Sequence, residues 1–114
     1  MGDRGNVRIK YDDGNSVYLY THWGGTELSQ MVARALDRGR KRWDDPSYLA
    51  RIIFCEMVKG YEMEETGFGI APYETVPDLN HPTITVDPGS KMVHVGEETC
   101  TFECYAYRAL SPPS

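Results

Sequence analysis

Two amphipathic segments follow one another in the middle of the 114-residue chain. In the first, apolar side chains recur at i, i+3, i+4, i+7 and i+8 from Leu28 to Leu36, and Gly39 then marks a helix end. In the second, Asp45 is a typical cap residue, Pro46 stands at the first helical position, and a broad apolar face follows. The pattern predicts two helices joined by a short link. Such a pair must bury its apolar faces against another layer.

The segments on either side alternate apolar and polar residues, which is typical of strands with one buried face. The expected strands are residues 6–11, 16–21, 67–71, 83–86, 91–95 and 99–108. An Asp-Asp-Gly-Asn turn joins the first two into a hairpin. We therefore expect an α+β fold, in which an antiparallel sheet carries a two-helix pair in the order ββααββββ. Residues 1–110 are expected to form one domain and residues 111–114 a flexible tail.

Composition places further bounds on the class of protein. Hydrophobic residues make up 40% of the chain and charged residues 25%, which is an ordinary globular balance. The net charge of −5 argues against binding to duplex nucleic acid, because dedicated binders carry a basic surplus. No apolar run approaches the roughly 20 residues of a membrane span, so we expect no membrane association. Three cysteines suit no disulfide framework, and we expect a cytoplasmic location, in the host cell if a phage encodes the chain.

A first candidate ligand site lies between the second strand and the first helix. Its residues are His22, Trp23, Gly24 and Gly25. Thr26 is the expected helix cap, and the exposed N–H groups of a helix start attract anions. In this interpretation Trp23 stacks on a base, His22 donates to a phosphate oxygen, and the glycines allow close approach. The alternative is a turn that needs two positive-φ glycines, with the indole packed into the core.

A second candidate site lies in the link between the helices. Its residues are Arg38, Arg40, Arg42 and Trp43. The window 34–51 holds six of the chain's 12 cations and only three acids, so it carries a net charge of +3. Arginine forks bind phosphate in bidentate fashion, and an anionic ligand would explain a basic cluster on an acidic chain. The alternative is a solvated link in which Asp37 and Asp44 pair with the cations.

Thr66 and Gly67 form a third candidate, at the start of a strand in which glycine occupies alternate positions. Such spacing leaves one face of the strand bare for a ligand or for a packed helix. Thr66 is suited to a hydrogen bond with a ribose or a base edge. The 13 aromatic residues exceed what so small a core needs, so we expect some of them on a surface.

The sequence offers little for metal or covalent chemistry. Cys100 and Cys104 follow His94, but three possible ligands without a paired C-x-x-C motif make a poor zinc site. Cys55 lies among apolar helix residues, where a buried structural thiol is expected. We predict no metal, no cofactor and no catalytic residue.

Three runs of sequence resemble a family of small phage and bacterial proteins of uncharacterised activity. These runs are THWGG at residues 21–25, RGRKRWDD at residues 38–45 and ETGFGI at residues 65–70. The resemblance covers about residues 6–95. In size and style the chain is also similar to compact phage counter-defence proteins. Some of those sequester cyclic nucleotide or cyclic ADP-ribose immune signals, and others block CRISPR effectors. This analogy implies an immune-evasion role.

These observations favour a non-catalytic protein that sequesters a phosphate-containing, nucleotide-type ligand. So small a chain rarely encloses a charged ligand alone, so a homodimer or a larger homo-oligomer is expected. One alternative is a stoichiometric inhibitor of a host defence protein, which would use the acidic clusters at residues 62–65 and 97–98. Another is a small phosphodiesterase with His22 or Asp44 as its general base.

Overall fold

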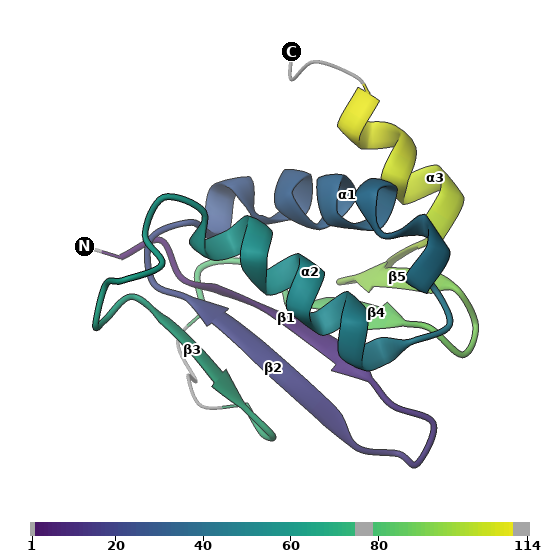
Figure 1. The fold of residues 1–114 in the computed structure, drawn as a ribbon, viewed down its shortest axis with the longest axis horizontal. Coiled ribbons are helices and arrows are strands. Elements are labelled where there is room, and N and C mark those ends of the chain that lie inside the picture. Colours follow the sequence, from purple (N-terminus) through teal and green to yellow (C-terminus); the bar gives the residue numbers. More distant parts are fainter. Residues whose placement is uncertain (1, 75–78, 111–114) are drawn as a thin grey trace.

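The computed structural model describes residues 2–74 and 79–110, in which helices cover one face of a six-stranded sheet (Figure 1). The strands are β1 (Gly5–Lys10), β2 (Ser16–Thr21), β3 (Phe68–Ala71), β4 (Ile84–Asp87), β5 (Met92–Val95) and β6 (Glu98–Thr101). The helices are α1 (Leu28–Arg38), α2 (Pro46–Val58) and α3 (Phe102–Tyr107). Three single-turn 3₁₀ segments are η1 (Gly25–Glu27), η2 (Arg40–Arg42) and η3 (Arg108–Leu110). The expected α+β class is confirmed. The tail expected at residues 111–114 lies outside the described residues.

The sheet is mixed, so the expectation of a wholly antiparallel sheet was wrong. Its strand order is β3-β2-β1-β4-β5-β6. β1 pairs antiparallel with β2, as the hairpin turn predicts, but β1 and β4 run parallel with Val7 opposite Ile84. The cause is the path of the chain. β3 lies at one edge of the sheet, and the described chain resumes beside β1, where the Asn80 N–H donates to the Arg4 carbonyl and β4 then pairs with the free side of β1.

The predicted helix pair is present and supplies much of the core. Asp45 caps α2 by accepting a hydrogen bond from the backbone N–H of Tyr48, and Pro46 is its first residue. In the apolar stripe of α1, Leu28, Val32, Ala35 and Leu36 are buried and Met31 is partly buried. This helix packs against α2 and α3, and α2 packs against β1 and β2. Cys55 was expected to be buried, but it is exposed, because it lies on the outer side of α2 and not on its buried face.

The last predicted strand was wrong after Thr101. The next six residues form α3, whose start is capped by the Thr101 hydroxyl accepting from the backbone N–H of Cys104. Phe102, Tyr105 and Ala106 are buried, at the i, i+3 and i+4 spacing of a helix. The alternation that predicted a strand places Cys104 on the buried face, whereas the structure leaves it exposed.

Among the described residues, no helix is both long enough and apolar enough to cross a membrane. The same residues contain no group of three or more His, Cys, Asp or Glu side chains placed to hold a metal ion.

Candidate functional site

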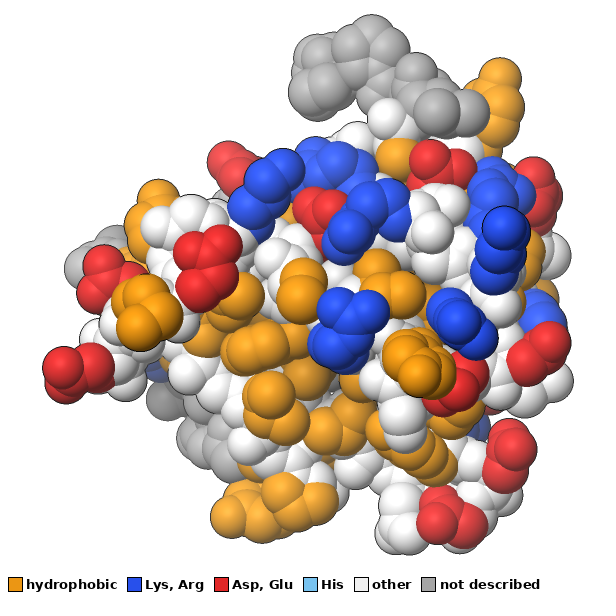
Figure 2. Space-filling view, in the orientation of Figure 1, with side chains coloured by type: hydrophobic (Ala, Val, Ile, Leu, Met, Phe, Trp, Pro, Cys, Tyr) orange, Lys and Arg blue, Asp and Glu red, His pale blue; other side chains and the backbone are white. Residues whose placement is uncertain are grey.

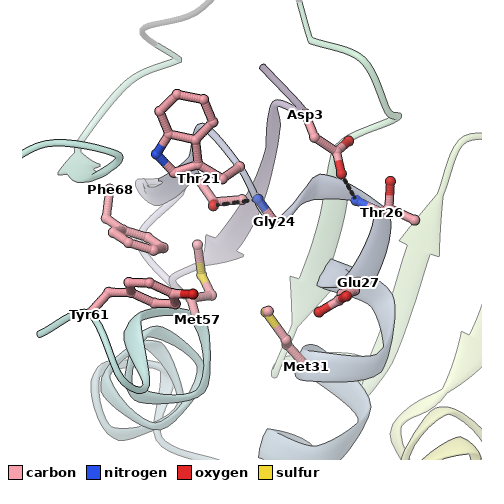
Figure 3. Close-up of a pocket in the computed structure, with 10 residues that line it drawn as sticks. Asp3, Thr21, Gly24, Thr26, Glu27, Met31, Met57, Tyr61 and Phe68 are labelled. Carbon is pink, nitrogen blue, oxygen red and sulfur yellow. Dashed lines mark hydrogen bonds between the residues drawn. The ribbon is translucent and has the colours of Figure 1, made fainter. Parts of the chain in front are cut away.

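A pocket of about 330 Å³ lies at the N-terminal end of α1, between the start of that helix and the end of α2 (Figure 3). Three aromatic side chains line it: Trp23 before η1, Tyr61 after α2, and Phe68 at the start of β3. The rings of Tyr61 and Phe68 lie side by side with centroids 6.2 Å apart. Met31 and Met57 add two flexible thioethers from α1 and α2. These five side chains give the pocket an apolar, polarisable wall.

The rest of the lining is polar and includes two carboxylates. Asp3, from the N-terminal segment, and Glu27, at the start of α1, lie on the side of the pocket opposite Tyr61 and Phe68 (Figure 3). Thr21, Gly24 and Thr26 also line it, and none of the described lining residues is a lysine or an arginine. The pocket is therefore acidic, which suits a cationic group or hydrogen-bond donors better than a phosphate.

The structure brings the first and third sequence candidates together. The backbone N–H of His22 donates to the Gly67 carbonyl at 2.8 Å, and the rings of His22 and Trp23 meet edge-on at 4.2 Å. Gly67 has φ of +97°, and a Cβ there would lie 2.8 Å from Trp23 Nε1. The positive φ favours glycine at this position, and a Cβ there would also require the exposed indole to shift. Thr66 is exposed beside it.

Trp23 itself is 59% exposed, so the interpretation that packs it into the core was wrong. That interpretation also required two positive-φ glycines, yet Gly24 has φ of −106° and Gly25 is not in the positive region. Gly25 is needed for close packing, because a Cβ there would lie 2.6 Å from His81 Cδ2 and 2.8 Å from the Asp3 carbonyl oxygen.

The chain's own Asp3 occupies the position in which an anion was expected. Its carboxylate accepts from the backbone N–H of Thr26 at 2.9 Å, and its carbonyl accepts from the N–H of Gly25 at 2.8 Å. The N–H of Gly24 donates to the Thr21 hydroxyl, and that of Glu27 to the Gly24 carbonyl. The expectation that Thr26 caps this helix start was therefore wrong. The cap is a carboxylate 23 positions earlier in the chain.

Hydrogen bonds from Thr26, and then the contact with His81, lower the pKa of Asp3 to about 2. His81 Nε2 lies 2.5 Å from the Asp3 carboxylate. Since this pKa is below the unfolded value of 3.8, the carboxylate stabilises the fold above about pH 4. That contribution is lost as the pH falls toward 2.

We expect Asp3→Asn to lower the midpoint of thermal unfolding at pH 7, because a neutral amide is a weaker acceptor at a helix start. Between pH 4 and pH 2 the variant should lose stability less steeply than the parent protein. Asp12→Asn, in the exposed β1–β2 turn, is the matched control. Calorimetric scans across this pH range measure both effects, and parallel profiles for the parent and Asp3→Asn would contradict the capping role.

The basic cluster of the second candidate is paired within the chain. Arg40 bonds to Asp37 at 3.1 Å and to Glu103 of α3 at 2.6 Å, and these contacts raise the pKa of Arg40. Arg38 pairs with Glu56 of α2 at 3.0 Å. The Arg42 guanidinium lies 4.7 Å from the centre of the Tyr48 ring. These contacts favour the alternative of a link whose cations are paired within the chain. Asp37 is one of the two expected partners, whereas Glu56 and Glu103 were not expected.

Trp43 is a structural residue of this link. Its Nε1 donates to the Leu36 carbonyl at 2.9 Å, and its ring meets the buried Phe102 edge-on with centroids 5.5 Å apart. Its side chain packs against the core, in contrast to that of Trp23. The pocket lies at the N-terminal end of the 11-residue α1, whereas Trp43 lies in the link beyond its C-terminal end and does not line the pocket. The structure therefore does not unite the Trp23 and arginine candidates into one site.

Most of the pocket was not anticipated from the sequence. Met31 and Met57 belonged to the predicted helix stripes, and Tyr61 and Phe68 were part of the aromatic surplus. No motif in the sequence around Asp3 indicated that this residue would line a pocket. No family model, curated protein or solved structure matches this chain.

Proposed function

We propose that the protein is a non-catalytic binding protein that takes a positively charged, partly apolar organic group into the Trp23 pocket. The observation that carries this proposal is the combination of three aromatic rings and two carboxylates around one small space. Aromatic faces attract cations, and carboxylates add a negative field. The Asp3 carboxylate is held at the pocket wall by its bonds to the Thr26 N–H and to His81.

The size of the pocket limits the bound group. A volume of about 330 Å³ is at the small end of ligand sites. It suits a single ring or one long side chain, such as an arylalkyl ammonium, a lysine or an arginine. The thioethers of Met31 and Met57 allow the walls to adapt to such groups.

A nucleotide-type ligand remains a second proposal, favoured by the exposed indole of Trp23. A base could stack on that ring, and Glu27 could accept from its amino group, whereas the phosphates would find no cation among the described lining residues. Phosphate contacts would then have to come from the basic cluster of a second copy, so a homo-oligomer belongs to this proposal. Sequestration of an immune signal would follow from it.

The phosphodiesterase alternative gains no support from the geometry. His22 Nδ1 is hydrogen-bonded to the Tyr20 hydroxyl at 2.8 Å, and Asp44 of the helix link pairs with Lys91 of the β4–β5 turn.

Titration calorimetry with phenethylammonium, and with its neutral counterpart 2-phenylethanol, tests the preferred function. We expect the ammonium to bind at least tenfold more tightly. Glu27→Gln should weaken its binding by roughly fivefold, since one charge contact at a solvent-exposed rim contributes about 1 kcal/mol. Glu97→Gln, an exposed glutamate in the β5–β6 turn, is the matched control and should change nothing.

Equal affinities for the two compounds would contradict the cation-binding function, as would an unchanged affinity in Glu27→Gln. If adenosine monophosphate binds more tightly than phenethylammonium, the result would support the nucleotide proposal instead.

A further inference from the structure

Exposed apolar side chains gather around the edge strand β3. Among the described residues, seven large hydrophobic side chains are exposed, and five of them lie in or beside the segment from residue 61 to residue 74. These five are Trp23, Tyr61, Met63, Ile70 and Tyr73. Figure 2 shows hydrophobic side chains collected over β2, β3 and the adjoining side of α2. Exposed apolar surface of this kind marks an interaction site.

The same segment is strongly acidic. Glu62, Glu64, Glu65 and Glu74 fall within it, and it contains no lysine or arginine. All four glutamates are exposed. Acidic side chains line the margin of the apolar surface where the loop between α2 and β3 lies (Figure 2). A partner for this surface must therefore combine apolar and positively charged side chains.

β3 also offers backbone hydrogen-bonding groups. Within the described ranges it has one strand neighbour, β2. The bond from the His22 N–H to the Gly67 carbonyl fixes which pairs of this antiparallel ladder exchange hydrogen bonds. Because bonded and non-bonded pairs alternate, the N–H and C=O groups of Phe68 and Ile70 point away from β2, toward the open edge. An added strand would bond to these groups.

A second copy of the chain is a poor occupant of this edge. Antiparallel pairing of two β3 strands centred on Gly69 sets Phe68 of one copy opposite Ile70 of the other, so that their outward groups can bond. Continued in the same register, this pairing would place Glu64 opposite Glu74 of the other copy, twice in the pair. Like charges directly opposite each other destabilise a ladder. The acidic flanks thus discourage self-association and favour a basic strand.

We propose that β3 binds an extended, basic segment of a partner protein as an added strand, with one cationic side chain of that segment in the Trp23 pocket. Backbone bonds to Phe68 and Ile70 would supply affinity, and the glutamates would select the charge. Phe68 belongs to both features, since it begins β3 and lines the pocket. The pocket part of this inference rests on the proposed function, whereas the strand part stands on the edge geometry.

Fluorescence anisotropy with a labelled ten-residue Lys-Val repeat peptide tests the inference on the full chain. We expect binding that weakens at least tenfold when alternate peptide amides are N-methylated, and no binding of a Glu-Val repeat. Glu64→Gln combined with Glu65→Gln should weaken binding about fivefold. Glu97→Gln combined with Glu98→Gln, an acidic pair beside the opposite sheet edge, should leave binding unchanged.

Ile70→Pro removes one outward N–H and should weaken peptide binding at least tenfold while phenethylammonium still binds. If this variant does not fold, the N-methylated peptide carries the same test. If phenethylammonium binds but N-methylation of the peptide has no effect, the added strand is overturned and the pocket function stands. The same conclusion follows if phenethylammonium binds and the Glu-Val peptide binds as well as the Lys-Val peptide. Peptide binding that is sensitive to N-methylation without phenethylammonium binding would support the strand and contradict the pocket. If the parent protein dimerises and Ile70→Pro abolishes the dimer, the edge of β3 binds a second copy of the chain and not a partner protein.

Discussion

Phe102→Ala should lower the free energy of unfolding by about 3–5 kcal/mol, the largest effect we expect from one substitution. Phe102 is fully buried at the start of α3, and its ring packs against Trp43 in the helix link. Its removal leaves a cavity between α3 and that link. Urea unfolding followed by circular dichroism measures the loss.

Two control substitutions in the same segment test whether residues 102–107 form helix α3 or the strand that the alternating pattern predicts. Tyr107→Ala, at a side chain that is 65% exposed, should change the free energy of unfolding by less than about 1 kcal/mol. Cys104→Glu should be similarly mild, because Cys104 faces solvent on a helix. A strand would bury residues 102, 104 and 106 together. A loss above about 2 kcal/mol in Cys104→Glu would therefore contradict the helix.

Trp23→Ala should reduce phenethylammonium affinity at least tenfold with little change in stability. The indole is 59% exposed, so truncation costs the fold less than about 1 kcal/mol. The pocket, however, loses one of its three aromatic walls. Calorimetric titration and thermal unfolding of the same variant give both quantities. Unchanged affinity, or unfolding of the variant at room temperature, would show that Trp23 is structural.

The sequence predicts the parts of this fold that depend on near neighbours. The stripe from Leu28 to Leu36 and the Asp45-Pro46 cap each act within one helix, and both helices were found where expected. The segment after Thr101 was misassigned because Phe102 and Ala106 fit a period of 2 as well as a helical turn. Six residues are too few to separate the two periods.

The remaining features depend on contacts between residues far apart in the chain. Asp3 reaches Thr26 across 23 positions, and Arg40 reaches Glu103 across 63. The first contact fills the predicted anion site, and the second ties up the predicted phosphate-binding arginine. No local pattern encodes either pairing. The sequence left the roles of Trp23 and Trp43 open for a related reason, because contacts with α1 and α3 together hold the second indole against the core.

The most direct test of the pocket is a ¹H–¹⁵N spectrum of the uniformly labelled protein during titration with phenethylammonium. The chain has two tryptophans, so two indole N–H signals report the two candidate sites separately. We expect one signal, which disappears in Trp23→Ala, to shift and saturate while the other stays fixed. A shift confined to the Trp43 signal, or no shift of either signal at saturating ligand, would contradict the account.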